Sequence, residues 1–533
     1  MRHGGPGLKA VDREGAVTAE SGTQVIGRPR GLVAAGRRLL RPASFVAIVT
    51  ALLAPGLAEG PSQDAAVFVL MGMRIRAGGM PYRDLWDHKP PGAYLLNALG
   101  QSAFPWLDPW LVSWVMSVVC TALAILLLDR LLRRRVSSRM AWFWTAVCAV
   151  TVACYPRTFG GGYTETFALL PLVAVLWLLD TRRGSWRVAA AIGGLLAIAS
   201  LLSIQAIPAA AALAVATALT TDGLRVSARQ SAALLTAGLV PLLLVLAWLG
   251  AGGALGDAVD QLVVYSAAYR AASPGLLGIL PLAVLPLTCL LLPAGVAVVR
   301  MIFRPRSYAR LDWICAAWLL GDLALVVYED RIYLHYLILA VPPLAFLAAP
   351  ACSGLWARIR SPRASVRRLA FGLSAGTIAM VVIALLFTAE ATVAMLINAS
   401  WWRNATVTTA DWVRANTPTS ARMFVWGNAA QLYLAANRDP YGHYMYEFPM
   451  TTAGYWSPQK TQDLVAAWKA DPPDVVVESA SDVPLFQVKT DSGDGRDYDT
   501  LEPLRAFIRA NYRLAASTGG MDVYLPSNAT PSS

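Results

Sequence analysis

The sequence predicts a polytopic α-helical membrane protein with about eleven transmembrane helices, followed by a small C-terminal α/β domain. The chain has 533 residues, of which 56% are hydrophobic and only 15% are charged, and its mean hydropathy is +0.49. A soluble protein of this length needs far more charge to cover its surface. Apolar runs close to ~20 residues long, enough for a spanning helix, recur up to residue 389. Beyond it the sequence is more polar.

Composition also excludes several classes of site. The net charge is +12, from 45 Lys and Arg against 33 Asp and Glu. Arg accumulates in the cytoplasmic loops of membrane proteins, so this excess does not indicate nucleic-acid binding. The six cysteines lie in or beside apolar runs without C-x-x-C spacing, which is typical of small buried hydrophobic residues. Four histidines without a Cys/His cluster give no support for a zinc site made by the protein.

The chain begins with a polar tail at 1–42, which is rich in Gly and Arg and lacks the apolar core of a signal peptide. We expect it to be cytoplasmic and disordered. The transmembrane domain is expected over 43–389, with a first outer loop at 59–108. Its apolar runs are 43–58, 109–129, 140–155, 163–179, 188–203, 205–220, 231–250, 276–299, 311–327, 336–351 and 369–389. Gln205 and Pro208 leave open whether 188–203 and 205–220 form a hairpin or one broken element.

The loops between these runs predict the orientation. Arg clusters fall in alternate connections, at 130–139, 182–187, 225–229, 300–310 and 358–368, whereas the opposite connections carry isolated cations outside 81–92. The positive-inside rule therefore puts the N-terminus in the cytoplasm and the loop 59–108 outside. With an odd number of spans, the C-terminal segment lies outside as well.

Residues 390–533 predict an extracytoplasmic α/β domain. Apolar density falls there, and Asp and Pro become more frequent. Met423–Trp426 and Val475–Val477 have the pattern of strands, whereas Ala429–Ala436 and Pro458–Ala470 have the pattern of helices.

The densest polar stretch of the membrane part is 81–92, in the first outer loop. It contains Arg83, Asp84, Asp87, His88 and Lys89, and it ends in two prolines that cannot lie inside a helix. Asp64 precedes this stretch in the same loop. The other outer connections and the adjoining ends of the expected spans contribute further acidic, cationic and aromatic residues: Tyr163, Glu165, Tyr269, Arg270, Arg331, His335 and Tyr336. Such a one-sided collection of reactive groups favours a chemical site at the outer face.

Several of these residues also have a purely structural interpretation. Asp64 opens an expected helix, Asp64–Arg76, and could be its N-cap. Glu165 could complement the positive end of a helix. His335 and Tyr336 fit an interfacial aromatic belt. Asp322 falls inside an expected span, where an acid is usually paired or functional, but the sequence does not reveal its partner.

The motifs resemble those of a known family. "GGMPYRDLWDHKPPGAY", preceded by Asp64, is similar to the glycosyltransferase-C superfamily, in the family 39-like bacterial branch of protein O-mannosyltransferases and lipid A aminoarabinose transferases. The similarity continues through "YTETFALLPL", "RIYLHYLILAVPPLA" and "VWGNAAQLYLAANRDP". It therefore touches nearly the whole chain. The first motif is the most specific of the four.

The resemblance implies an integral-membrane glycosyltransferase that moves a sugar from a polyprenyl-phosphate donor to an acceptor hydroxyl, outside the bacterial cytoplasmic membrane. An acidic residue of the first outer loop acts as base in that family, and Asp64 occupies this position. The donor phosphate needs cations, for which Lys89, Arg83, Arg270 and Arg331 are the candidates. We expect Lys89 and Arg83 to hold it, with Asp87 and His88 shaping the pocket. The acceptor would be a glycan, a lipid or a protein.

The sequence leaves open both the use of a metal and the class of function. Some relatives have an acid where this chain has His88, and relatives differ in metal use, so no cofactor is assigned and a divalent metal stays open. A lipid or sugar transporter is the alternative function, and it predicts ionisable residues at the middle of the membrane. A non-catalytic assembly subunit is a third reading, and it predicts that the outer loops tolerate neutral substitutions.

Overall fold

The computed structural model describes residues 30–154, 161–181, 185–218, 228–271, 287–329, 333–359, 362–365, 367–368, 393, 405–479, 484–486 and 499–528. Its described residues form two units, one up to Ser44 and one from Phe45 onward. The described part of the expected tail is helical from Arg30, where α1 begins. The fold described below belongs to the second unit.

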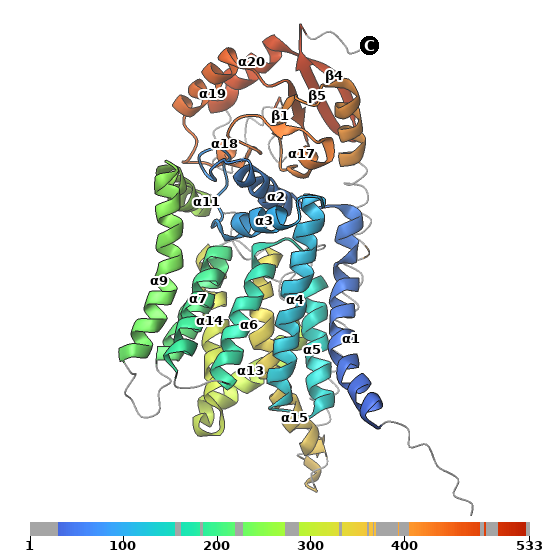
Figure 1. The fold of residues 1–533 in the computed structure, drawn as a ribbon, viewed down its shortest axis with the longest axis vertical. Coiled ribbons are helices and arrows are strands. Elements are labelled where there is room, and N and C mark those ends of the chain that lie inside the picture. Colours follow the sequence, from blue (N-terminus) through green and yellow to red (C-terminus); the bar gives the residue numbers. More distant parts are fainter. Residues whose placement is uncertain are drawn as a thin grey trace, which may run out of the picture. The chain divides into compact units, whose positions relative to one another are not determined.

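The membrane part is built from helices, several of which run alongside one another (Figure 1). Their bounds are α1 Arg30–Glu59, α2 Gln63–Arg76, α3 Gly92–Ala103, α4 Pro109–Arg133, α5 Ser138–Cys154, α6 Thr164–Thr181, α7 Trp186–Leu202, α8 Ile207–Ala218, α9 Ala228–Ala251, α10 Leu255–Val259, α11 Ser266–Ala271, α13 Thr288–Phe303, α14 Arg310–Glu329 and α15 Val341–Ile359. A π-helical segment, Asp260–Tyr265, joins α10 to α11, and a 3-10 helix, Leu334–Ala340, precedes α15.

The helical membrane fold that the sequence predicts is confirmed. Within the described residues, six helices are long and apolar enough to cross a membrane: Leu40–Leu57, Pro109–Arg133, Thr164–Thr181, Ala228–Ala251, Arg310–Tyr328 and His335–Gly354. The shorter apolar helices include Trp186–Leu202 and Ile204–Thr217. The break expected near Gln205 is a 3-10 turn at Ile204–Ala206. The expected run 369–389 lies outside the described residues, so the count of eleven stays a prediction.

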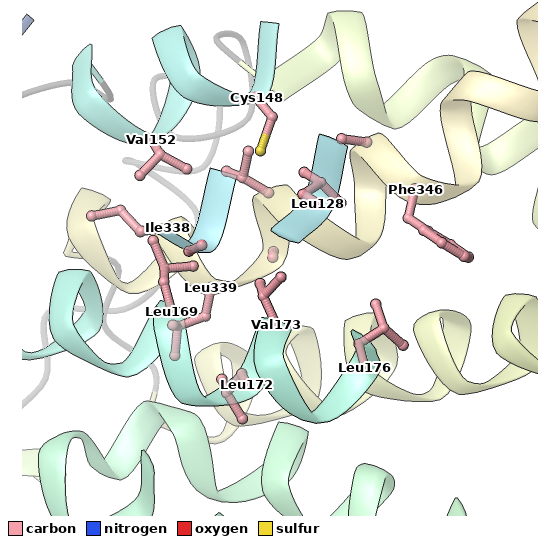
Figure 2. Close-up of a cluster of buried hydrophobic side chains, with 14 of the residues drawn as sticks. Leu128, Cys148, Val152, Leu169, Leu172, Val173, Leu176, Ile338, Leu339 and Phe346 are labelled. Atoms are coloured by element: carbon pink, nitrogen blue, oxygen red, sulfur yellow. The ribbon is translucent and has the colours of Figure 1, made fainter. Parts of the chain in front are cut away.

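The helices pack through a continuous apolar core. Side chains of α4, α5, α6 and the segment 334–359 interdigitate there (Figure 2). Their packing excludes water from the centre of the bundle, which stabilises the arrangement. Cys148 is part of this core, and Cys315 and Cys352 are also buried and unbridged. Asp322 on α14 accepts a hydrogen bond of 2.8 Å from Trp318 Nε1, which identifies the partner that the sequence could not reveal.

The segment 59–108, expected as the first outer loop, forms two helices, α2 and α3, that pack closely together. A Cβ at Gly72 of α2 would come within 2.7 Å of Asn97 Cβ of α3, so glycine permits this contact. Ser62 is the N-cap of α2, and its Oγ accepts from the Ala65 amide at 3.2 Å. The N-cap interpretation of Asp64 is therefore wrong: Asp64 lies in the first turn, and its carboxylate is available for another role.

The C-terminal part contains the expected small α/β structure. Its elements are a helix over 405–416, β1 Arg422–Trp426, α17 Gln431–Ala436, β2 Asp439–Pro440, α18 Phe448–Thr451, α19 Pro458–Ala470, β3 Val475–Glu478, α20 Glu502–Asn511, β4 Tyr512–Thr518 and β5 Met521–Pro526. The sheet order is β2-β1-β3-β5-β4. The β1 strand pairs in parallel with β2 and β3, and β5 is antiparallel to β3 and β4.

The two faces of this sheet bury different cores. Phe424 and Trp468 belong to the core under α19 and α20. Val425 and Val477 belong to the other core, which also includes residues of α2, α3 and the loop between them. Alternation of side chains along a strand explains why neighbours in sequence join different cores. The C-terminal sheet and the polar loop 81–92 therefore share one hydrophobic core.

Candidate active site

The loop between α2 and α3 is held in a strained backbone conformation. Tyr82 has a positive φ of 67°, a region that a bulky residue rarely adopts. Such strain costs roughly 1–3 kcal/mol and persists only where surrounding contacts maintain it. Tyr82 is completely buried, and its carbonyl accepts a hydrogen bond of 2.7 Å from Gln261 Nε2. The contacts of Gln261 therefore fix the start of the loop.

Asp87 is the centre of a buried hydrogen-bond network in this loop. Tyr94 donates to its Oδ2 at 2.6 Å, and Tyr446 donates to its Oδ1 at 2.8 Å. The His88 amide also donates to Oδ1, at 2.8 Å. Burial alone would raise the pKa of Asp87, but the interactions with His88, Tyr94 and Tyr446 outweigh it and lower that pKa. Asp87 therefore stays ionised and anchors the loop.

Lys89 is presented by this anchored loop. Its carbonyl accepts hydrogen bonds from Tyr82 at 2.8 Å and from Tyr94 at 2.9 Å, so the backbone is fixed while the side chain extends. Its Nζ lies 3.4 Å from Tyr336 Oη, and among the described residues it forms no salt bridge. Burial lowers the pKa of Lys89, but Tyr336 and the surrounding carboxyl groups raise it overall. This ammonium stays charged and can receive an anion.

Asp64 faces the same region from the first turn of α2. Burial raises the pKa of its carboxyl group, and the charge of Lys89 offsets this rise only in part. Asp87 raises this pKa further, and His88 lowers it. The residue nevertheless keeps intermediate exposure, as do His88 and Lys89. A crowded carboxylate that solvent can still reach, with a lysine nearby, has the properties expected of a general base.

The glycine-containing loop before α6 packs against α2 beside Asp64. Gly162 has a φ of 82°, and a Cβ there would come within 2.7 Å of Ala65 Cβ. The next residue, Tyr163, interacts with Ser62 and stacks on His335 with ring centroids 4.7 Å apart. Only glycine allows this close approach at this φ. The loop therefore connects the first turn of α2 with the 3-10 helix Leu334–Ala340, which contains His335.

Replacing Gly162 by alanine tests this packing. The positive φ and the 2.7 Å contact with Ala65 predict a loss of about 1–3 kcal/mol in unfolding free energy, together with reduced activity because the first turn of α2 is displaced. Thermal unfolding in detergent measures the first effect. Gly78→Ala is the control, since Gly78 has a similar φ of 85° with nothing within 4 Å. Equal losses in both variants would contradict the packing explanation.

Glu165 follows in the first turn of α6 and is almost completely buried. Ser203 donates to its Oε1 at 3.2 Å, whereas Oε2 has no hydrogen-bond partner among the described residues. Glu165 also lies near enough to Lys89 to raise the pKa of the ammonium. It is therefore a second carboxyl group whose charge acts on the same cation.

Aromatic rings border the site on the side of the π-helical segment. The His88 ring lies 5.7 Å from Tyr269, and Tyr269 is hydrogen-bonded to Tyr333. Tyr333 in turn packs edge-on against Tyr336, the residue that contacts Lys89. Arg270 is exposed and lies over the Tyr328 ring, 4.5 Å from its centroid. A chain of ring contacts thus runs from His88 through Tyr269 and Tyr333 to Tyr336 beside Lys89.

Two of the candidates form a separate group. Arg83 is exposed and donates to Asp84 at 2.7 Å and to the Gly252 carbonyl at 2.7 Å. Asp84 also binds Arg74 and the Met80 amide. This ion-paired group links the end of α2 to the residue that follows α9. Arg331, the remaining candidate, lies outside the described residues.

Sequence reasoning did not select Gln261 or Tyr446. Gln261 Oε1 accepts from the Asp87 amide at 3.1 Å, and its Nε2 lies 3.4 Å from His443 Nε2. Both residues act on a loop that is more than a hundred residues away in sequence, so no spacing pattern connects them to it. Tyr94 could have been found, because it is the last residue of the quoted motif and lies in the first turn of α3.

The comparisons with known proteins agree with this architecture. No family model and no curated protein matches the sequence. Solved structures of ArnT from Cupriavidus metallidurans do match it. The complex with undecaprenyl phosphate has 16% identity and a TM-score of 0.57, and covers 94% of this chain and 100% of that chain. The apo state has 15% identity and a TM-score of 0.58 over the same shares. The chain has the glycosyltransferase-C fold.

A third structure has a lower similarity. AglB from Archaeoglobus fulgidus, an oligosaccharyltransferase in complex with an inhibitory peptide and a dolichol-phosphate, has 12% identity and a TM-score of 0.48, and covers 84% of this chain and 70% of that chain. As to metal, no group of three or more His, Cys, Asp or Glu in the described part of the chain is arranged to hold an ion.

Proposed function

We propose that the protein is an integral-membrane glycosyltransferase that moves a sugar from a polyprenyl-phosphate donor to an acceptor hydroxyl. One observation carries the proposal: a reachable carboxylate with a raised pKa, Asp64, and a charged lysine without a salt bridge among the described residues, Lys89, face one region of a glycosyltransferase-C fold. ArnT, a lipid A aminoarabinose transferase, has this fold and was crystallised with undecaprenyl phosphate.

The proposed reaction uses Asp64 as the base. The acceptor hydroxyl oxygen attacks the anomeric carbon of the donor sugar, and its proton passes to the Asp64 carboxylate. The bond between the anomeric carbon and the phosphate oxygen breaks at the same time. The products are the glycosylated acceptor and a free polyprenyl phosphate, so that atoms and charge balance. General base catalysis of this kind contributes about 10²–10⁴-fold.

Lys89 is the proposed ligand of the donor phosphate. Negative charge develops on the leaving phosphate, and a fixed ammonium that is partly shielded from water stabilises it. Tyr336, whose hydroxyl lies 3.4 Å from Lys89 Nζ, offers a further hydrogen-bonding group at the same place. Arg83 is already bonded to Asp84 and Gly252, so the proposal puts the phosphate at Lys89. The remaining site residues, Glu165, His335 and Tyr163, are proposed to contact the donor sugar.

The proposal also places the reaction outside the cytoplasmic membrane of a bacterium. The Arg-rich loops predict this orientation, with the N-terminus in the cytoplasm. The acceptor is a glycan, a lipid or a protein of the cell envelope. Membranes containing the protein, supplied with labelled polyprenyl-phosphate sugar, test the function: label must appear in an envelope fraction. Transport of the intact donor without transfer would favour a transporter.

The pH dependence of kcat/KM follows from Asp64. The base must be ionised, and burial raises the pKa of this carboxyl group in the folded protein. Transfer should therefore fall as the pH drops through a value above the ordinary aspartate pKa of about 4. Lys89, whose pKa is raised, should cause no loss of activity on the alkaline side near neutrality. An acid limb at or below about pH 4 would argue against Asp64 as the base.

A further inference from the structure

Tyr446, a residue of the C-terminal part of the chain, contacts the loop that carries Lys89. It lies between β2 and α18 and is 4% exposed. Its hydroxyl donates to Asp87 Oδ1 at 2.8 Å, and its ring packs edge-on against Trp86 with centroids 5.7 Å apart. A tyrosine from the C-terminal part thus donates a hydrogen bond to the buried carboxylate of Asp87, two residues before Lys89.

Neighbouring residues attach the same stretch to the loop at other points. The Trp86 amide donates to the His443 carbonyl at 2.8 Å, and Trp86 Nε1 donates to the Tyr455 hydroxyl at 3.3 Å. The His443 ring nitrogen Nδ1 lies 3.0 Å from the Arg83 carbonyl. The loop is therefore bound along its length by residues 443–455, and Tyr446 is the one that reaches the Asp87 carboxylate.

We infer that Tyr446 is a positioning residue of the transfer reaction, which acts through Asp87 on the placement of Lys89. This inference rests on the proposed function, in which Lys89 binds the donor phosphate. The connection is direct. Tyr446 donates to one oxygen of Asp87, and the single proton of the Tyr94 hydroxyl is shared between the other oxygen, at 2.6 Å, and the Lys89 carbonyl, at 2.9 Å. The prolines that follow Lys89 leave the backbone little freedom to compensate.

Loss of the Tyr446 hydroxyl leaves Asp87 Oδ1 with one donor fewer in a buried position. A hydrogen bond to a charged group is stronger than a neutral one, and its loss loosens the carboxylate that ties the loop together. The effect should appear in the binding of the donor, since Lys89 contacts the phosphate in the ground state as well as in the transition state. A purely structural role would instead lower stability and leave the KM for the donor unchanged.

The experiment compares Tyr446→Phe with Tyr512→Phe in the full-length protein. Tyr512 is a matched control, because it is also buried and its hydroxyl donates at 2.7 Å to the Pro473 carbonyl within the C-terminal part. The KM for a polyprenyl-phosphate sugar, kcat and the unfolding temperature are measured for each. We expect Tyr446→Phe to raise the KM by about tenfold, whereas Tyr512→Phe changes stability alone.

A second arm tests whether Tyr446 acts through Asp87. In an Asp87→Ala background, Tyr446→Phe should add less than about a twofold further rise in the KM, because the two residues share one interaction. Equal KM values for Tyr446→Phe and Tyr512→Phe, or full additivity with Asp87→Ala, would overturn the inference while the proposed function stands. A wild-type protein that transfers no sugar would overturn both. Normal transfer by Lys89→Ala would overturn the role of Lys89 and with it the inference, while the transferase activity stands.

Discussion

Asp64→Asn should reduce sugar transfer by about 10²–10⁴-fold, because an amide cannot accept the proton of the acceptor hydroxyl. The protein should remain folded. Burial raises the pKa of this carboxyl group in the folded protein. At neutral pH the ionised carboxylate therefore lowers the stability of the folded state. Removing the charge therefore leaves the unfolding temperature at neutral pH unchanged or higher. The rate is measured as label moved from polyprenyl-phosphate sugar into envelope fractions.

Asp108→Asn provides the matched control for this variant. Asp108 is the N-cap of α4, and its Oδ1 accepts from the Leu111 amide at 2.9 Å. Asparagine caps helices about as well as aspartate, so this change removes one exposed negative charge with little effect on the fold. Transfer should continue at the wild-type rate. Wild-type transfer by Asp64→Asn itself would show that the base lies elsewhere.

Lys89→Ala should lower kcat/KM by about 10²–10³-fold, the range typical of removing one group that stabilises charge in a transition state. The cause is loss of the ammonium that faces the leaving phosphate. The substitution also removes the charge that lowers the pKa of Asp64 most, so the pKa of that carboxyl group rises further. The acid limb of the pH profile should therefore move to higher pH in any residual activity.

Substitutions of two other cations serve as controls for Lys89→Ala. Arg76→Ala, on the exposed side of α2, should have no effect on transfer. Arg83→Ala tests the second cation of the motif, which is bonded to Asp84 and Gly252. It should lower stability more than activity. A larger loss of kcat/KM in Arg83→Ala than in Lys89→Ala would move the phosphate site to Arg83.

Much of the fold could be predicted because it depends on local patterns. The apolar runs predicted the helices, and β1, β3 and α19 lie where alternation and helical spacing placed them. The expected helix Asp64–Arg76 ends where α2 ends, and Gly78 follows it with a φ of 85°. Capping was assigned wrongly, because Ser62 competes with Asp64 for the same role and sequence alone does not decide between them.

The candidate site was predicted only where its residues are close in sequence or belong to recognisable motifs. Asp87 and Lys89 were selected together, but the tyrosine that holds Asp87 comes from the C-terminal part. Gln261 was missed because a single glutamine between two expected spans has no pattern, and the π-helical turn that directs it cannot be read from spacing. Long-range hydrogen bonds of this kind depend on the folded structure.

The most direct test of the central claim is the lipid product of the reaction. Purified protein in vesicles, supplied with polyprenyl-phosphate sugar and an envelope extract as acceptor, should release free polyprenyl phosphate in step with loss of the donor sugar. Asp64→Asn and Lys89→Ala vesicles should release almost none. If wild-type vesicles carry the intact donor across the membrane without releasing polyprenyl phosphate, the protein is a transporter and the glycosyltransferase proposal is wrong.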